Sequence, residues 1–163
     1  MTGKYIILTE EIFHELEALT EVIAHIETGV VDFQKVAEEN KVYIIEAVAL
    51  SLQSFYTGIE NIFRRIATYI DGALPTGEKW HTNLLERMSI LLPEIRPAVI
   101  SNDTKQELKE FLSFRHAIRS VYIFEINGNR VIELASTAAM FFQKLKTDLD
   151  RFTTFLKQVG NGN

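Results

Sequence analysis

The sequence of 163 residues contains no cysteine. A disulfide framework, a thiol nucleophile and a thiolate metal site are therefore excluded. No apolar run approaches the length of a membrane span, and Glu10 and Glu11 come too early for a signal peptide. A Gly-rich phosphate loop is missing, and no His and carboxylate residues have the spacing of metal ligands. We therefore expect a cytoplasmic protein that is not inserted in a membrane and that uses no metal and no other cofactor.

Proline is scarce and confined to one region. The three prolines, Pro75, Pro93 and Pro97, all lie between residues 72 and 98. Proline is the strongest helix breaker, so the chain before Gly72 and the chain after Ser101 are free to be helical almost throughout.

Apolar residues in these stretches recur in alternating three- and four-residue steps, which is the pattern of amphipathic helices. The longest pattern, from Ile45 to Tyr69, exceeds three heptads and predicts a helix from about residue 40 to residue 70. Only Tyr5–Leu8 suggests a strand. The other predicted helices cover residues 12–26 with a stop at Gly29, 80–92, about 104–124 after a cap at Ser101, and 138–159 after a turn at 127–129.

These elements define the expected fold class. We predict an all-α protein, an antiparallel four-helix up-and-down bundle with one short extra helix. The length fits a single domain over residues 1–163.

The net charge of −5 hides an asymmetry along the chain. Residues 1–60 carry three basic and eleven acidic side chains, whereas residues 61–163 carry fourteen basic and eleven acidic ones. An acidic total argues against general nucleic-acid binding, because phosphate contacts dominate such affinity. The segregated basic residues permit a local anion site, although acidic and basic helices can also simply pair.

A dense polar cluster interrupts the fourth predicted helix. At about 100° per residue, Arg115, Arg119 and Tyr122 fall on one narrow face of that helix. Arginine matches phosphate geometry, and His116 beside it can move protons near neutral pH, so the pattern favours work on a phosphodiester. The alternative is an ordinary helix whose polar residues are solvated.

The same helix carries two leucines outside its main apolar stripe. Leu108 and Leu112 lie one to two turns before Arg115, on the side of the arginines. A helix with two apolar faces usually has two partners, so we expect a homodimer that uses this helix near its two-fold axis. The symmetry would bring two copies of the polar cluster together.

The fold and the motif resemble the HEPN superfamily, specifically the HepT-like ribonuclease toxins. The family motif is Arg-x4-to-6-His, often Arg-x4-His-x-Tyr, with a polar residue after the Arg. Arg115, His116 and Tyr122 match the Arg, the polar residue and the Tyr, but Ser120 stands at the His position. Serine does not titrate near neutral pH, so either the imidazole has moved to His116 or cleavage has been lost.

The resemblance implies a metal-independent endoribonuclease, the toxin of a pair with a nucleotidyltransferase antitoxin. Arg115 and Arg119 would then hold the RNA phosphate, and His116 would be the general acid or base. Tyr122 would orient the phosphate and be the site where the antitoxin attaches AMP, and Ser120 would contact the substrate. The competing interpretation is a non-catalytic helical module that binds a nucleotidyltransferase.

Three further residues have two interpretations each. Glu60 matches a family position where a polar residue sometimes faces the cleft, which makes it a candidate for substrate binding, or it is a carboxylate that forms an ion pair. Trp80 and His81 can stack on a base or anchor the loop before their helix.

Overall fold

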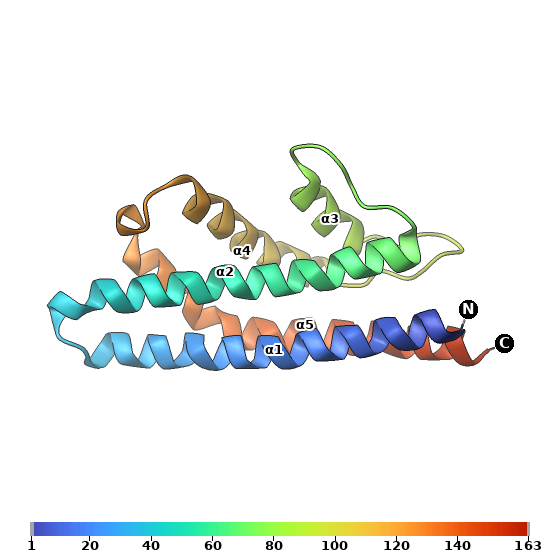
Figure 1. Ribbon diagram of the computed structural model, residues 1–163, viewed down its shortest axis with the longest axis horizontal. Helices are drawn as coiled ribbons and strands as arrows, with labels where there is room; N and C mark the ends of the chain where they lie inside the picture. The colour runs from blue at the N-terminus through green and yellow to red at the C-terminus, as the bar shows by residue number, and fades with distance from the viewer. Residues whose placement is uncertain (1, 163) are drawn as a thin grey trace.

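The computed structural model describes residues 2–162 and is helical, with no strand in that range. The all-α prediction is confirmed. Helices α1, α2 and α5 run along the long axis, and the shorter α3 and α4 lie over α2 (Figure 1). The bounds are α1 Thr2–Lys35, α2 Lys41–Ile66, α3 Trp80–Met88, α4 Asn102–Ser120 and α5 Gly128–Asn161. Short 3₁₀ helices lie at Glu38–Asn40 (η1) and Ile123–Glu125 (η3), and a π-helical segment at Ala67–Asp71 (η2) continues α2.

Helix α2 is the centre of the bundle, because it packs against each of the other four helices. From Val48 to Ile66 its predicted apolar face is no more than 1% exposed, whereas Ile45 and Tyr69 at the two ends of the pattern are more accessible. The Phe55 ring meets three phenylalanine rings from α4 and α5 edge-on, at centroid distances of 5.4 to 6.1 Å. Such aromatic pairs add about 0.5–1.5 kcal/mol each beyond the area that they bury. The long heptad pattern therefore identified the core helix correctly.

The stretch Glu38–Asp71, which contains α2, is long and apolar enough to cross a membrane by length and composition alone. This differs from the expectation that no apolar stretch approaches the length of a membrane span. Its buried apolar residues line the core of the bundle.

Helix α1 differs from the sequence prediction at both ends. Tyr5–Leu8 is helical and not a strand, and Gly29 does not stop the helix, which continues to Lys35. Gly29 instead faces α2, where an added Cβ atom would lie 2.3 Å from Cγ2 of Val48. The glycine therefore allows α1 and α2 to approach closely, which offsets its low helix propensity.

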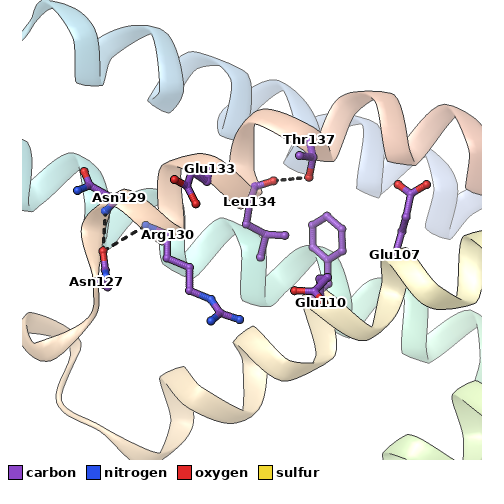
Figure 2. Close-up of a pocket in the computed structure, with 9 residues that line it drawn as sticks. Glu107, Glu110, Asn127, Asn129, Arg130, Glu133, Leu134 and Thr137 are labelled. Carbon is purple, nitrogen blue, oxygen red and sulfur yellow. Dashed lines mark hydrogen bonds between the residues drawn. The ribbon is translucent and has the colours of Figure 1, made fainter.

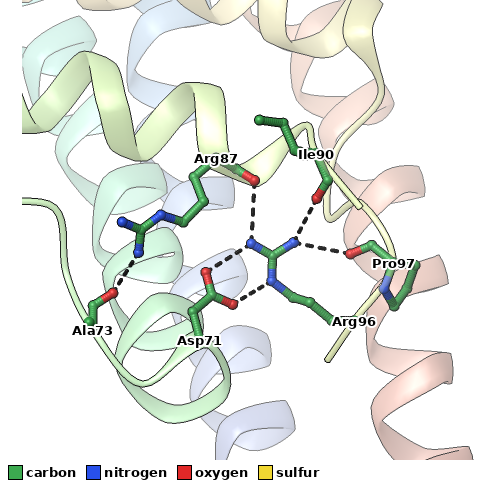
Figure 3. A network of polar contacts seen from close by, with 6 residues as sticks. All are labelled: Asp71, Ala73, Arg87, Ile90, Arg96 and Pro97. Carbon is green, nitrogen blue, oxygen red and sulfur yellow. Dashed lines mark hydrogen bonds and ion pairs between the residues drawn. The ribbon is translucent and has the colours of Figure 1, made fainter. Parts of the chain in front are cut away.

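The connection from α2 through α3 to α4 is held by one buried ion pair (Figure 3). Arg96 donates to both carboxylate oxygens of Asp71, at 2.6 and 2.9 Å, and also to the carbonyl oxygens of Arg87, Ile90 and Pro97. Its side chain is fully buried. Because Arg87 and Ile90 lie at the end of α3 and just beyond it, this guanidinium ties α3 to the end of α2. Helix α3 is also shorter than predicted, ending at Met88 and not at Leu92.

Helix α4 begins at the predicted cap, where Oγ of Ser101 accepts a hydrogen bond from the Thr104 amide. Leu108 and Leu112 are 0% and 4% exposed, so they are part of the core of their own chain. The expectation that they face a second chain is wrong, because α4 packs against α2, α3 and α5 and both of its apolar faces have partners within the monomer.

Helix α5 begins at the predicted turn. The side chain of Asn127 caps it by accepting hydrogen bonds from the amides of Asn129 and Arg130. The helix therefore starts about ten residues earlier than its apolar pattern suggested.

Candidate functional site

A buried carboxylate and an imidazole form the centre of the candidate site. Glu60 lies on α2 and is 4% exposed, and its Oε2 is 2.6 Å from Nδ1 of His81 at the start of α3. A carboxylate accepts and does not donate, so His81 donates from Nδ1 and its Nε2 is left for another partner. Of the two interpretations of Glu60, the contact with His81 agrees with a carboxylate that has a partner inside the fold.

A second imidazole lies against the first. The ring of His116, on α4, meets the His81 ring edge-on at a centroid distance of 5.7 Å. Partial burial lowers the pKa of His116, the neighbouring charges of His81 and Arg115 lower it further, and the charge of Glu60 opposes this. His116 is therefore mainly neutral at neutral pH and can accept a proton.

Arg115 is buried next to these groups, at 8% exposure. No residue in the range 2–162 accepts a hydrogen bond from its buried Nε atom. Tyr56, on α2, is 1% exposed, and burial raises the pKa of its hydroxyl far above the usual value. The charge of Glu60 raises this pKa further, and the charge of Arg115 lowers it. The tyrosine therefore stays protonated. A buried guanidinium whose Nε has no partner is suited to binding an anion, because a hydrogen bond to a charged acceptor is stronger than one to a neutral acceptor.

These five residues, Tyr56, Glu60, His81, Arg115 and His116, are called the polar cluster below. They come from three helices that are far apart in the chain and meet where α2, α3 and α4 contact one another.

Three other predicted residues lie outside the polar cluster. Arg119 and Ser120 are exposed at the end of α4, and the Ser120 hydroxyl donates to the Ala117 carbonyl of its own helix. Tyr122 lies beyond the helix, because Val121 is already extended with φ −132° and ψ 163°. Tyr122 is 71% exposed and stacks on Phe124. The prediction that it shares a helical face with Arg115 and Arg119 is therefore wrong.

The site does not coincide with the groove between α4 and α5. A groove of about 570 Å³ between α4 and α5 is lined by Phe111 and Leu134 and by polar residues that include Glu110, Arg130 and Glu133 (Figure 2). None of the predicted site residues lines it. Within residues 2–162, no three His, Cys, Asp or Glu side chains are placed to hold a metal ion.

Sequence reasoning missed the importance of His81. The residue is separated from Glu60 by 21 positions and from His116 by 35, so no local spacing joins them. The sequence feature that could have pointed to His81 was the adjacent Trp and His at the start of an amphipathic helix. The Trp80 ring stacks on the His81 ring at 3.7 Å, so it anchors the imidazole and does not offer that face to a base.

An all-helical bundle whose penultimate helix carries a buried arginine at a polar cluster has the features of a HEPN-type protein. A family model described as HepT-like protein matches residues 47–156. The chain therefore belongs to the HepT-like family. The matched range contains the whole polar cluster. Searches of curated proteins and of solved structures return no match.

Proposed function

We propose that this protein is a metal-independent endoribonuclease. The observation that carries the proposal is the contact between the imidazoles of His81 and His116, one of them bound to Glu60, next to the unpartnered Nε of Arg115. Two imidazoles beside one guanidinium provide a proton acceptor, a proton donor and a phosphate ligand. These are the three groups that RNA cleavage by its own 2′-hydroxyl requires.

Each of these side chains has one role in the proposed reaction. Neutral His116 takes the proton of the 2′-hydroxyl, and the 2′ oxygen then forms a bond to phosphorus. The bond from phosphorus to the 5′ oxygen breaks, and that oxygen takes a proton from Nε2 of His81, the ring nitrogen that does not contact Glu60. The products are a 2′,3′-cyclic phosphate and a 5′-hydroxyl end. Arg115 stabilises the charge on the phosphate, and Glu60 stabilises the positive charge on His81.

The setting of the reaction is also part of the proposal. We place the protein in the cytoplasm, as a homodimer and as the toxin partner of a nucleotidyltransferase. The exposed apolar segment Val121–Phe124 supports a contact with another chain, now that Leu108 and Leu112 do not. The exposed hydroxyl of Tyr122 is in reach of a modifying enzyme, which supports its role as the AMP acceptor.

One observation favours a second function, that of a non-catalytic binding module. Ser120 stands where the family motif has its histidine, and its hydroxyl is bonded within its own helix. A module of this kind would bind RNA or a nucleotidyltransferase without cleaving RNA.

The test compares three histidine variants on single-stranded and structured RNA in the presence of a chelator. His81→Ala and His116→Ala should each lower kcat by at least a hundredfold, because proton transfer contributes about 10²–10⁴. His25→Ala is the matched control, since His25 is exposed on α1 and should leave kcat unchanged.

The products of the wild-type protein should carry 2′,3′-cyclic phosphate ends. A folded wild-type protein that binds RNA and cleaves none would support the binding module. Cleavage that persists in both His81→Ala and His116→Ala would refute the assigned mechanism.

A further inference from the structure

Beside the polar cluster, a row of stacked side chains leads to a second concave surface. The guanidinium carbon of Arg64, on α2, lies 5.6 Å from the centre of the Trp80 ring, and Trp80 stacks on His81. On the surface of α2 and the residues after it, Arg64 also lines a groove of about 380 Å³. We call this the Arg64 groove; its lining residues are Asn61, Arg64, Arg65, Thr68, Tyr69 and Leu74.

The two arginines in this groove differ in their partners. Arg65 is engaged, with Nη1 at 3.3 Å from both a carboxylate oxygen of Glu15 and the Glu11 carbonyl oxygen. Arg64 forms no ion pair with any residue between 2 and 162 and is exposed. An exposed guanidinium held only over an aromatic ring is able to bind phosphate without breaking a salt bridge.

The remaining lining adds the chemistry of a nucleobase site. Tyr69 is 39% exposed, so one part of its ring is open for stacking. Asn61 supplies an amide that both donates and accepts hydrogen bonds, as the edge of a base requires. Base stacking on aromatic side chains needs a base that is unpaired, which is the usual way in which proteins bind single-stranded RNA.

We propose that the Arg64 groove is a subsite for the nucleotide next to the cleaved bond of a single-stranded RNA. In this subsite Arg64 binds the phosphate and Tyr69 stacks on the base. The inference rests on the proposed ribonuclease function, because it is the row from Arg64 through Trp80 to His81 that links the groove to the reacting phosphate. The substrate is accordingly an unpaired strand that extends past the cleaved bond.

The experiment compares cleavage of a dinucleotide, which contains only the cleaved bond, with cleavage of a single-stranded heptanucleotide. In the wild-type protein kcat/KM should be higher for the heptanucleotide, and Arg64→Gln should reduce this advantage at least tenfold. Tyr69→Leu should reduce it as well, because it removes the stacking surface. Lys157→Gln, which removes an exposed positive charge from α5, should keep the wild-type ratio.

Binding is measured separately in a His116→Ala background, where cleavage is disabled. The heptanucleotide should bind more tightly than a duplex of the same sequence. Arg64→Gln should reduce the slope of log affinity against log salt by about 0.7, the value for one phosphate contact on a single strand. Trp80 is the only tryptophan, so its fluorescence should report the departure of Arg64 from its ring.

The outcomes separate the two proposals. If the wild type cleaves RNA and Arg64→Gln keeps both the length advantage and the salt slope, the Arg64 groove is not a subsite. A loss in Arg64→Gln that is equal for both substrates also overturns the inference, because Arg64 then acts only by positioning Trp80 and His81. If the wild type cleaves nothing but its affinity still depends on Arg64, the ribonuclease proposal fails and the groove stands as an RNA-binding site.

Discussion

Replacement of Arg96 by methionine should be strongly destabilising. The Arg96 side chain is fully buried and Asp71 is 3% exposed at its side chain, so the substitution leaves a carboxylate in the interior without its partner. It also removes the donors to three carbonyl oxygens at the end of α3 and in the loop that follows. Breaking a buried pair in this way costs about 3–5 kcal/mol, a large part of the 5–15 kcal/mol that is typical of a whole domain.

The assay is urea unfolding followed by circular dichroism, arranged as a double-mutant cycle. The double variant Arg96→Met, Asp71→Leu should recover much of the loss, because it removes both buried charges and keeps apolar volume. Glu38→Gln is the control: Glu38 pairs with Lys41 but is 85% exposed at its side chain, so the change should stay within about 0.5 kcal/mol. A loss of less than about 1 kcal/mol in Arg96→Met would refute the conclusion that this ion pair holds α3 in place.

Three further predictions concern the helix contacts and the site. Gly58→Ala should lower the free energy of unfolding in urea by about 1 kcal/mol or more, because the new Cβ would lie 2.6 Å from Cδ2 of buried Leu19. A gain in stability would contradict the tight packing of α1 against α2 at this point. His116 has a lowered pKa in the folded state, so the unfolded chain binds the proton of this imidazole more tightly. The free energy of unfolding should therefore fall as the pH drops from about 6.5 through the folded pKa, and His116→Ala should remove this part of the pH dependence. Sulfate should raise the Tm by bridging Arg115 and Arg119, and Arg119→Gln should weaken the effect; a large loss of stability in that variant without sulfate would show a structural role instead.

The sequence predicted the helices well where a long apolar period existed. The apolar pattern through α2 extends over more than three heptads, because this helix is buried in the core. The predicted helix, from about residue 40 to residue 70, therefore agrees closely with Lys41–Ile66. Gly29 shows the limit of this reasoning. A glycine is a weak stop signal along one chain, but here its meaning depends on Val48 of the opposite helix, which no local pattern reveals.

The candidate site was predicted only in part, for two physical reasons. The first is that the helical periodicity was assumed to continue beyond Ser120, where α4 ends. Tyr122 was therefore placed on the same helical face as Arg115, although it lies outside the helix. The second is that the strongest contact of the site, between Glu60 and His81, joins two helices. Arg115 and His116 were identified because their chemistry is evident in one short stretch, whereas His81 becomes significant only through packing.

The loop between α2 and α3 divides the site along the chain. Residues 72–79 are exposed apart from Pro75, and Gly72 and Gly77 have positive φ angles. Glu60 and Arg64 precede this loop, and His81 and His116 follow it. A single cut in the loop would thus leave each half of the chain with only part of the polar cluster. Two separately expressed fragments would rebuild the polar cluster only by reassembly, which makes the loop a natural position at which to divide the protein into two halves.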